Sequence, residues 1–271
     1  MKPQHTQPDP HPHPYTRYVA IGDSQTEGIG DGDEVNGYRG WADRLAELLA
    51  AANPGLTYAN LAVRGRLAAQ VKEGQLAPAL ALKPDVATVV AGMNDLIRPG
   101  ADPARIAADV EEMCAELAAS GARVATVTYP DLGLIAPAAR RLVPRVVDFN
   151  ARIRDMAERH GIALVDTFPH VSTTDARVWS SDRLHASPYG HALIASAMAD
   201  ALGLPGHADW AKPLPPLAPV PTWRAGVTEV RWVAGFMGPW IWRRIRGRSS
   251  GDGRSAKRPE LGPVTPVGPG A

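Results

Sequence analysis

The sequence predicts an α/β fold built on a doubly wound, five-stranded parallel sheet with flavodoxin-like strand order. From residue 17 onward, short apolar runs alternate with helical patterns, which is typical of βαβ units and of a sheet covered on both faces. Right-handed crossovers between successive strands then favour the doubly wound order. The length of 271 residues is sufficient for one sizeable domain with a full core.

The first half of this domain is predicted to contain three strands and two helices. The strands are Arg17–Ile21, Thr57–Leu61 and Val86–Val90, the last indicated by its β-branched run. Apolar residues from Trp41 to Leu49 have helical spacing, and Asn53-Pro54-Gly55 ends that helix. A short helix spans Leu67–Leu82 and stops at Lys83-Pro84-Asp85.

The second half adds two strands and three helices. The strands are Arg123–Tyr129 and Ile162–Asp166. Asp102-Pro103 indicates a helix start, with an N-cap followed by proline at the first helical position, and Gly121 ends that helix. The other two helices are Pro144–His160, which Gly161 ends, and Pro188–Leu202.

Four further segments flank the predicted domain, which covers residues 17–204. Residues 1–16 are rich in Pro and His and are expected to be disordered, as are residues 249–271. Residues 205–222 contain six prolines and are predicted to form a linker. Residues 223–248 form a basic, tryptophan-rich amphipathic segment that either packs on the domain or contacts an anionic membrane surface.

Composition narrows the function classes. The net charge of +1 gives no argument for a nucleic-acid partner, although residues 223–258 carry nine Lys/Arg against two Asp/Glu. The single cysteine, Cys114, excludes an internal disulfide framework and lies in an apolar helical stripe. Neither a secretory signal nor a membrane-spanning run is recognisable, so a cytoplasmic location is expected, with a peripheral position at the inner membrane surface as an extension.

Polar side chains gather where the predicted strands end. Ser24 follows the first strand, Gly65 the second and Asn94 the third, while Asp182 and His185 lie between the fifth strand and the last helix. Because ligands bind at the carboxyl ends of parallel strands, all five are expected at one edge of the sheet.

These residue types fit acyl transfer. A serine hydroxyl is a weak nucleophile until a base removes its proton, and His185 fits that role. Asp182, three residues earlier, would fix the histidine tautomer and stabilise the imidazolium. Backbone N–H groups of Ser24 and Gly65, together with the Asn94 amide, would donate to the oxyanion of the intermediate. The sequence predicts ester hydrolysis without metal or cofactor.

The ordered blocks resemble those of the SGNH hydrolases, or GDSL-type esterase/lipase family. The blocks are Gly22-Asp23-Ser24, Asn60 to Gly65, Gly92-Met93-Asn94-Asp95 and Asp182-Arg183-Leu184-His185, within residues 17–203. Gln25 stands where that family often has Leu. The resemblance implies a three-layer α/β/α fold, a Ser-His-Asp hydrolase of small-molecule esters, and an oxyanion hole shared by Ser24, Gly65 and Asn94.

Two alternatives come from other classes. A non-catalytic ligand-binding or scaffold domain would keep the fold, but the intact Ser24, His185 and Asp182 set argues against it. A phosphate-binding turn after the first strand would need several glycines, whereas this turn carries the acidic Asp23. The acyl chain length, the alcohol part of the substrate and the oligomeric state are left open by the sequence.

Overall fold

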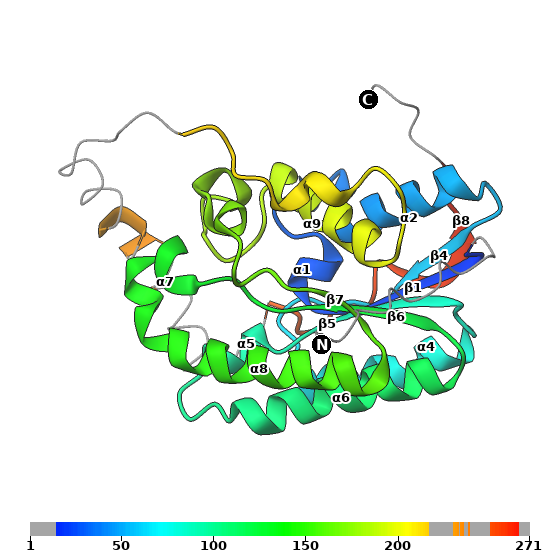
Figure 1. The fold of residues 1–271 in the computed structure, drawn as a ribbon, viewed down its shortest axis with the longest axis horizontal. Coiled ribbons are helices and arrows are strands. Elements are labelled where there is room, and N and C mark those ends of the chain that lie inside the picture. Colours follow the sequence, from blue (N-terminus) through cyan, green and yellow to red (C-terminus); the bar gives the residue numbers. More distant parts are fainter. Residues whose placement is uncertain (1–14, 217–229, 233, 236–237, 239–249, 266–271) are drawn as a thin grey trace, which may run out of the picture.

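The computed structural model describes residues 15–216, 230–232, 234–235, 238 and 250–265. Its centre is a six-stranded sheet of order β7-β6-β5-β1-β4-β8, drawn in Figure 1. The strands are β1 (Arg17–Gly22), β4 (Thr57–Asn60), β5 (Val86–Val90), β6 (Arg123–Val127), β7 (Ala163–Val165) and β8 (Arg258–Pro263).

The strand order confirms the doubly wound prediction. β1 pairs in parallel with β4 on one side and with β5 on the other, and β6 and β7 continue the parallel sheet beyond β5. This is the flavodoxin-like order, in which the strand order reverses next to β1. The register sets Gly22, the last residue of β1, against Val90, the last residue of β5. The segments after these two strands therefore begin side by side.

The predicted count of five strands is corrected by β8. This strand pairs antiparallel with β4 and sets Tyr58 opposite Gly262, within the region expected to be disordered. Its sequence, Arg-Pro-Glu-Leu-Gly-Pro, has no β-branched run, and proline is tolerated in a sheet only at an edge. Arg258 fixes the pairing: its Nε donates to the carbonyl of Tyr58 at 2.9 Å, and its guanidinium lies over the Tyr58 ring.

Helices cover both faces of the sheet, as expected for a three-layer α/β/α fold. One layer packs Trp41, Leu45 and Met198 into a core with the sheet. The opposite layer buries Val110 and Phe149 against the other face. The first layer consists of α2 (Trp41–Ala52) and α9 (Pro188–Ala201), and the second of α3 (Ala68–Val71), α4 (Ala77–Ala81), α6 (Pro103–Ala119) and α8 (Val143–His160) (Figure 1).

Short elements complete the loops. Three brief helices follow strand ends: α1 (Ser24–Glu27), α5 (Met93–Leu96) and α7 (Leu132–Ile135). The small hairpin is β2 (Gly32–Asp33) with β3 (Gly37–Tyr38). The 3₁₀ turns are Pro137–Leu142, Val171–Thr174, Ala176–Val178 and Ala208–Ala211. The carboxyl ends of the parallel strands point to the left of Figure 1, where α1, α5 and α7 begin.

Two local predictions can be compared directly with the structure. Asp102 caps α6 as expected, because its carboxylate accepts from the backbone N–H groups of Ala104 and Arg105. The predicted helix Leu67–Leu82 is instead divided by a π-helical turn at Lys72–Leu76. Such turns redirect side chains. Here the turn contains Gln75, which is buried and reaches the end of β1.

The C-terminal region is described in part. Within the predicted linker 205–222, Trp210 packs edge-to-face on His170 and its Nε1 donates to Asp200 at 3.2 Å. Most of the basic segment 223–248 lies outside the described residues, as do residues 1–14 of the N-terminal segment 1–16 that was expected to be disordered. Thr16 is described, and its carbonyl accepts from the N–H of Thr57 at 2.8 Å. In the part of the chain that the structure describes, no helix is long and apolar enough to cross a membrane.

Candidate active site

Ser24 stands at the turn between β1 and α1. Asp23 caps α1, its carboxylate accepting from the backbone N–H of Gln25 at 3.3 Å. Gly22 has φ +154°, and a Cβ there would clash with the carbonyl of Val90 on the neighbouring strand. Gln75 holds the same residue from the other side, since its amide accepts from the N–H of Gly22 and donates to its carbonyl, both at 2.9 Å. The turn that presents Ser24 is thereby fixed on three sides.

The three residues predicted to form a triad are brought together. His185 Nε2 lies 2.9 Å from Ser24 Oγ, and His185 Nδ1 lies 2.6 Å from Asp182 Oδ2. With its proton on Nδ1, the imidazole donates to Asp182 and accepts from the hydroxyl of Ser24. Ser24 and His185 are 161 residues apart in the chain, so this contact is made by the fold and not by local sequence.

Asp182 is held by its own turn. Its Oδ1 accepts from Ser180 Oγ at 2.6 Å, from Leu184 N at 2.8 Å and from His185 N at 2.9 Å. Burial raises the pKa of Asp182, but the hydrogen bond and charge of His185, with the other donors, lower it to about 2. The carboxylate therefore stays charged at any neutral or mildly acidic pH.

Asn94 and Gly65 lie at the same edge. Asn94, in α5, donates from Nδ2 to Asp23 Oδ2 at 3.0 Å and to the carbonyl of Arg66 at 3.1 Å. Gly65 precedes Arg66 and has φ +76°, a left-handed conformation that favours glycine. Asn94 thus bridges the loop that carries the nucleophile and the loop that carries Gly65.

Two acidic residues, Asp23 and Asp95, brace these loops. Asp23 accepts from Asn94 and Gln25, and Asp95 accepts from the N–H of Ala68 at 2.9 Å. Burial raises the pKa of Asp23 and of Asp95, each to about 6. Both carboxyl groups therefore titrate near neutral pH, in contrast with Asp182.

Side-chain contacts also join the Asn60–Gly65 segment to α1. Asn60 is buried, and its Nδ2 donates to the carbonyl of Thr26 at 2.8 Å. Arg64 forms a buried ion pair with Glu27, and the N–H of Arg64 donates to the Glu27 carboxylate at 2.7 Å. These contacts hold the Gly65 loop against the helix that begins at Ser24.

Some site residues escaped prediction. Gln25 was noted in the sequence only as a departure from the family pattern. Its side chain donates to the carbonyl of Leu184 at 2.8 Å and accepts from the N–H of Ala186 at 3.2 Å. Gln25 therefore binds the backbone on both sides of His185. His191 accepts from Trp41 N and donates to the carbonyl of Ile29. Burial lowers the pKa of His191 to about 4, which keeps it neutral.

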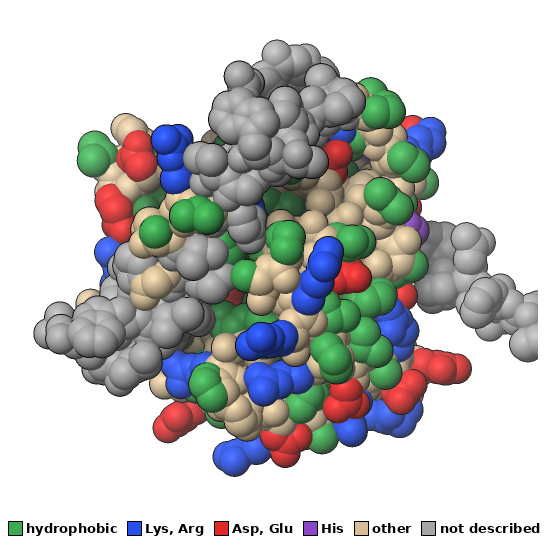
Figure 2. Space-filling view, turned by 90° about the vertical axis from the view of Figure 1, so that its left-hand side faces the viewer, with side chains coloured by type: hydrophobic (Ala, Val, Ile, Leu, Met, Phe, Trp, Pro, Cys, Tyr) green, Lys and Arg blue, Asp and Glu red, His purple; other side chains and the backbone are tan. Residues whose placement is uncertain are grey.

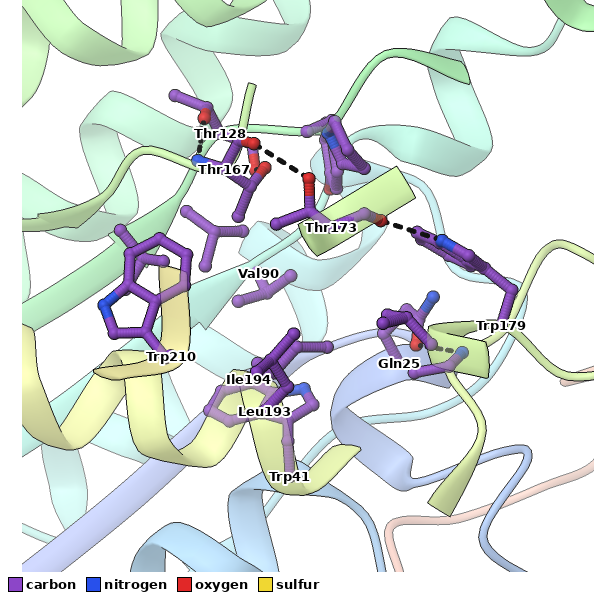
Figure 3. A pocket seen from close by; sticks show the side chains of 16 residues that line it. Gln25, Trp41, Val90, Thr128, Thr167, Thr173, Trp179, Leu193, Ile194 and Trp210 are labelled. Atoms are coloured by element: carbon purple, nitrogen blue, oxygen red, sulfur yellow. Dashed lines mark hydrogen bonds between the residues drawn. The ribbon is translucent and has the colours of Figure 1, made fainter. Parts of the chain in front are cut away.

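An apolar cavity of about 70 Å³ lies beside Gln25 and Ala186 (Figure 3). Trp41, Trp179 and Trp210 form part of its wall. Polar groups on its lining have hydrogen-bond partners, since Thr167 Oγ1 donates to the carbonyl of Thr128, and Trp179 Nε1 to that of Thr173. The space therefore suits a small apolar group and not a charged one.

The edge of the sheet carries a mixed surface. Figure 2 looks onto this side, and on its described part Lys and Arg side chains lie among hydrophobic and acidic ones. Among the residues that the structure describes, no group of three or more His, Cys, Asp or Glu is arranged to hold a metal ion.

Solved structures share this architecture. LAE5, described as an α/β hydrolase enzyme from the metagenome of Lake Arreo, is 24% identical with a TM-score of 0.58, covering 70% of this chain and 95% of its own. TesA is 21% identical with a TM-score of 0.58, covering 69% and 98%. A single-residue variant of Axe2, an acetyl xylan esterase from Geobacillus stearothermophilus, is 20% identical with a TM-score of 0.58, covering 70% and 95%. At these identities the likeness shows the fold.

The family follows from a separate comparison. No curated protein matches the sequence. The sequence profile of the GDSL-like lipase/acylhydrolase family matches residues 20–193, which include all five predicted site residues and most of the chain. The chain belongs to the GDSL-like lipase/acylhydrolase family and is an esterase or lipase of that type.

Proposed function

We propose that this protein cleaves carboxylic esters or thioesters through a covalent acyl-enzyme on Ser24. One observation carries the proposal: the continuous chain from Ser24 Oγ to His185 Nε2, at 2.9 Å, and from His185 Nδ1 to Asp182 Oδ2, at 2.6 Å. Nucleophile, base and orienting acid are within hydrogen-bond reach of one another, as acyl transfer requires.

The first half of the reaction forms the acyl-enzyme. Ser24 Oγ attacks the carbonyl carbon of the ester while its proton passes to His185 Nε2. Asp182 stays ionised and stabilises the imidazolium that forms, which its pKa of about 2 allows. When the tetrahedral intermediate collapses, the bond to the leaving group breaks and His185 Nε2 returns the proton to the departing alcohol or thiol.

The second half releases the acid. A water molecule takes the place of the alcohol and attacks the acyl carbon, and His185 accepts its proton as the new bond forms. Collapse of this second intermediate breaks the bond to Ser24 Oγ, which regains the proton from His185. The products are a carboxylic acid and the free enzyme.

The oxyanion of both intermediates needs preorganised donors. We assign this role to the backbone N–H groups of Ser24 and Gly65 and to Asn94 Nδ2, which lies at the same edge and is held there by Asp23 and Arg66. To serve the oxyanion, the Asn94 amide turns one hydrogen from a protein oxygen to the substrate oxygen. Each such donor typically lowers the barrier by roughly 3–4 kcal/mol.

Substitution of Ser24 by Ala tests the proposal. The variant removes one oxygen atom and should leave the fold, measured by its thermal midpoint, unchanged. Hydrolysis of p-nitrophenyl acetate should fall to less than about a hundredth of the wild-type rate. A variant that retains more than this would exclude Ser24 as the nucleophile and favour the non-catalytic alternative for these residues.

A peripheral contact between the basic segment 223–248 and an anionic membrane surface stays a prediction. Of the four tryptophans in that segment, Trp232 is turned inward, being only 8% exposed. Trp232 is therefore not available to such a surface.

A further inference from the structure

The turn that carries Asp182 and His185 contains an unusual backbone conformation. Arg183, between them, has φ +54°, the left-handed region that residues with a Cβ rarely occupy. Among the described residues only Arg183 and Lys83 show this without being glycine. A conformation of this kind persists only where surrounding contacts enforce it, and such residues cluster at functional sites.

Several contacts enforce the turn from within the family domain. The N–H of Arg183 donates to the carbonyl of Ser180, and the N–H of Ser180 donates to the carbonyl of His185, each at 2.9 Å. Gln25 grips the backbone on both sides of His185. None of these contacts involves the backbone carbonyl of Asp182, which forms the peptide bond between Asp182 and Arg183.

That carbonyl is held from outside the matched region. Trp232 lies 39 residues beyond the end of the family match at residue 193, and its Nε1 donates to the carbonyl of Asp182 at 2.8 Å. The Arg183 guanidinium lies over the Trp232 ring, 5.0 Å from its centroid. One buried side chain thus contacts two consecutive residues of the turn.

The C-terminal region meets the other side of the site as well. Gly251 packs so closely against the carbonyl of Arg64 that a Cβ at this position would clash with it. Arg254 pairs with Glu34 at 2.9 Å, and Glu34 also pairs with Arg64 at 2.6 Å. Residues beyond the family domain therefore contact the acid–base loop through Trp232 and the Gly65 loop through Gly251.

We infer that Trp232 is a positioning residue for catalysis, which holds the Asp182–His185 turn in the geometry that the reaction needs. The inference rests on the proposed function of the triad. Trp232 acts by fixing the peptide that carries Asp182. Loss of its N–H should loosen the link between Asp182 and His185 and should therefore lower kcat more than it changes KM.

The test compares one variant at the site with one control variant of the full-length protein. Trp232→Phe keeps an aromatic ring over Arg183 but removes the N–H donor. Asn53→Ala is the control, because it also removes a side-chain donor to a backbone carbonyl, that of Tyr15 at 2.8 Å, just before β1 and away from the triad. We expect Trp232→Phe to lower kcat for p-nitrophenyl acetate about fivefold, as loss of one hydrogen bond does, with KM within about twofold. The control should keep its kcat.

A double-mutant cycle separates positioning from general stability. If Trp232 acts through Asp182, then Trp232→Phe should have little further effect on kcat in the Asp182→Asn background. A full fivefold loss in that background, or an unchanged kcat in the single variant, would overturn the inference. Ser24→Ala distinguishes the two claims: if it stays active, the proposed function fails, whereas an inactive Ser24→Ala with a normal Trp232→Phe rejects only the role of Trp232.

Discussion

Two buried aspartates at the site, Asp182 and Asp23, have opposite electrostatic behaviour. Both residues are buried, since Asp182 is 9% exposed and Asp23 is 3% exposed. Asp182 accepts from Ser180, Leu184 and His185, and its pKa falls to about 2. Asp23 accepts from Gln25 at 3.3 Å and Asn94 at 3.0 Å, and burial raises its pKa to about 6.

Burial raises the pKa of both carboxyl groups, and the donors around Asp182 outweigh it whereas those around Asp23 do not. A turn that aims three N–H or O–H groups and an imidazole at one carboxylate keeps it ionised. Asp23 has fewer and longer hydrogen bonds, so ionisation of its buried carboxyl group costs more free energy. It can brace a loop in either protonation state, which an orienting acid cannot do.

The largest expected effect is on catalytic activity. It is seen by replacing Asp182 and Asp23, one at a time, by asparagine. Asp182→Asn should lower kcat/KM for p-nitrophenyl acetate by about 10⁴-fold, because the amide no longer fixes the His185 tautomer. Asp23→Asn should cost far less, since Asp23 caps α1 and positions Asn94 but is not bonded to the base. Equal losses at the two positions, with both variants folded by circular dichroism, would remove the distinction between orienting and bracing acids.

An intermediate effect is expected at Asn94, the residue that Asp23 holds. Asn94→Ala should lower kcat by roughly 10²–10³-fold with a modest change in KM, as removal of an oxyanion donor does. Steady-state kinetics with the same ester measure both constants. Asn36, in the exposed loop after β2, supplies the control Asn36→Ala, which should be neutral. A rise in KM with kcat intact would mean that Asn94 binds the ground state instead.

The smallest effect is on stability and depends on pH. The pKa of Asp23 is raised from 3.8 to about 6, so its contribution to stability is full below about pH 4 and is lost as the pH rises through 6. Asp23→Asn, which cannot ionise, should therefore gain about 1–3 kcal/mol in unfolding free energy on going from pH 4 to pH 8, relative to wild type. Urea denaturation at both pH values measures this.

Asp182 should show the reverse sign. Its pKa is lowered, so its contribution is present above about pH 4 and is lost as the pH falls through 2. Asp182→Asn should accordingly destabilise the protein at pH 8. A gain in stability at pH 8 for both variants, or no pH dependence for Asp23→Asn, would contradict the assigned environments.

The sequence was sufficient to predict the parallel sheet, and it placed the candidate site residues in the loops at the ends of its strands. Strands such as Val86–Val90 are buried on both faces and read as continuous apolar runs, and each site residue follows a strand or precedes a helix. Those signals are local. The edge strand β8 has no such signal, since it carries two prolines and a glycine and depends on pairing with β4.

Contacts between residues far apart in the sequence could not be predicted from it. Gln25 and Trp232 both hold the turn that contains His185, from 159 and 50 residues away. Neither residue type nor spacing marks a side chain that donates to a distant backbone carbonyl. The π-helical turn that brings Gln75 to Gly22 is a third case, because a regular helix fits the same sequence pattern.

The central claim is that Ser24, activated by His185 and Asp182, forms the covalent intermediate. Incubation with a fluorophosphonate, which reacts with activated serines, followed by intact-protein and peptide mass spectrometry tests it most directly. The wild-type protein should gain one phosphonyl group, located on Ser24, and His185→Ala should react far more slowly. A label on another serine, or equal labelling of Ser24→Ala, would contradict the claim.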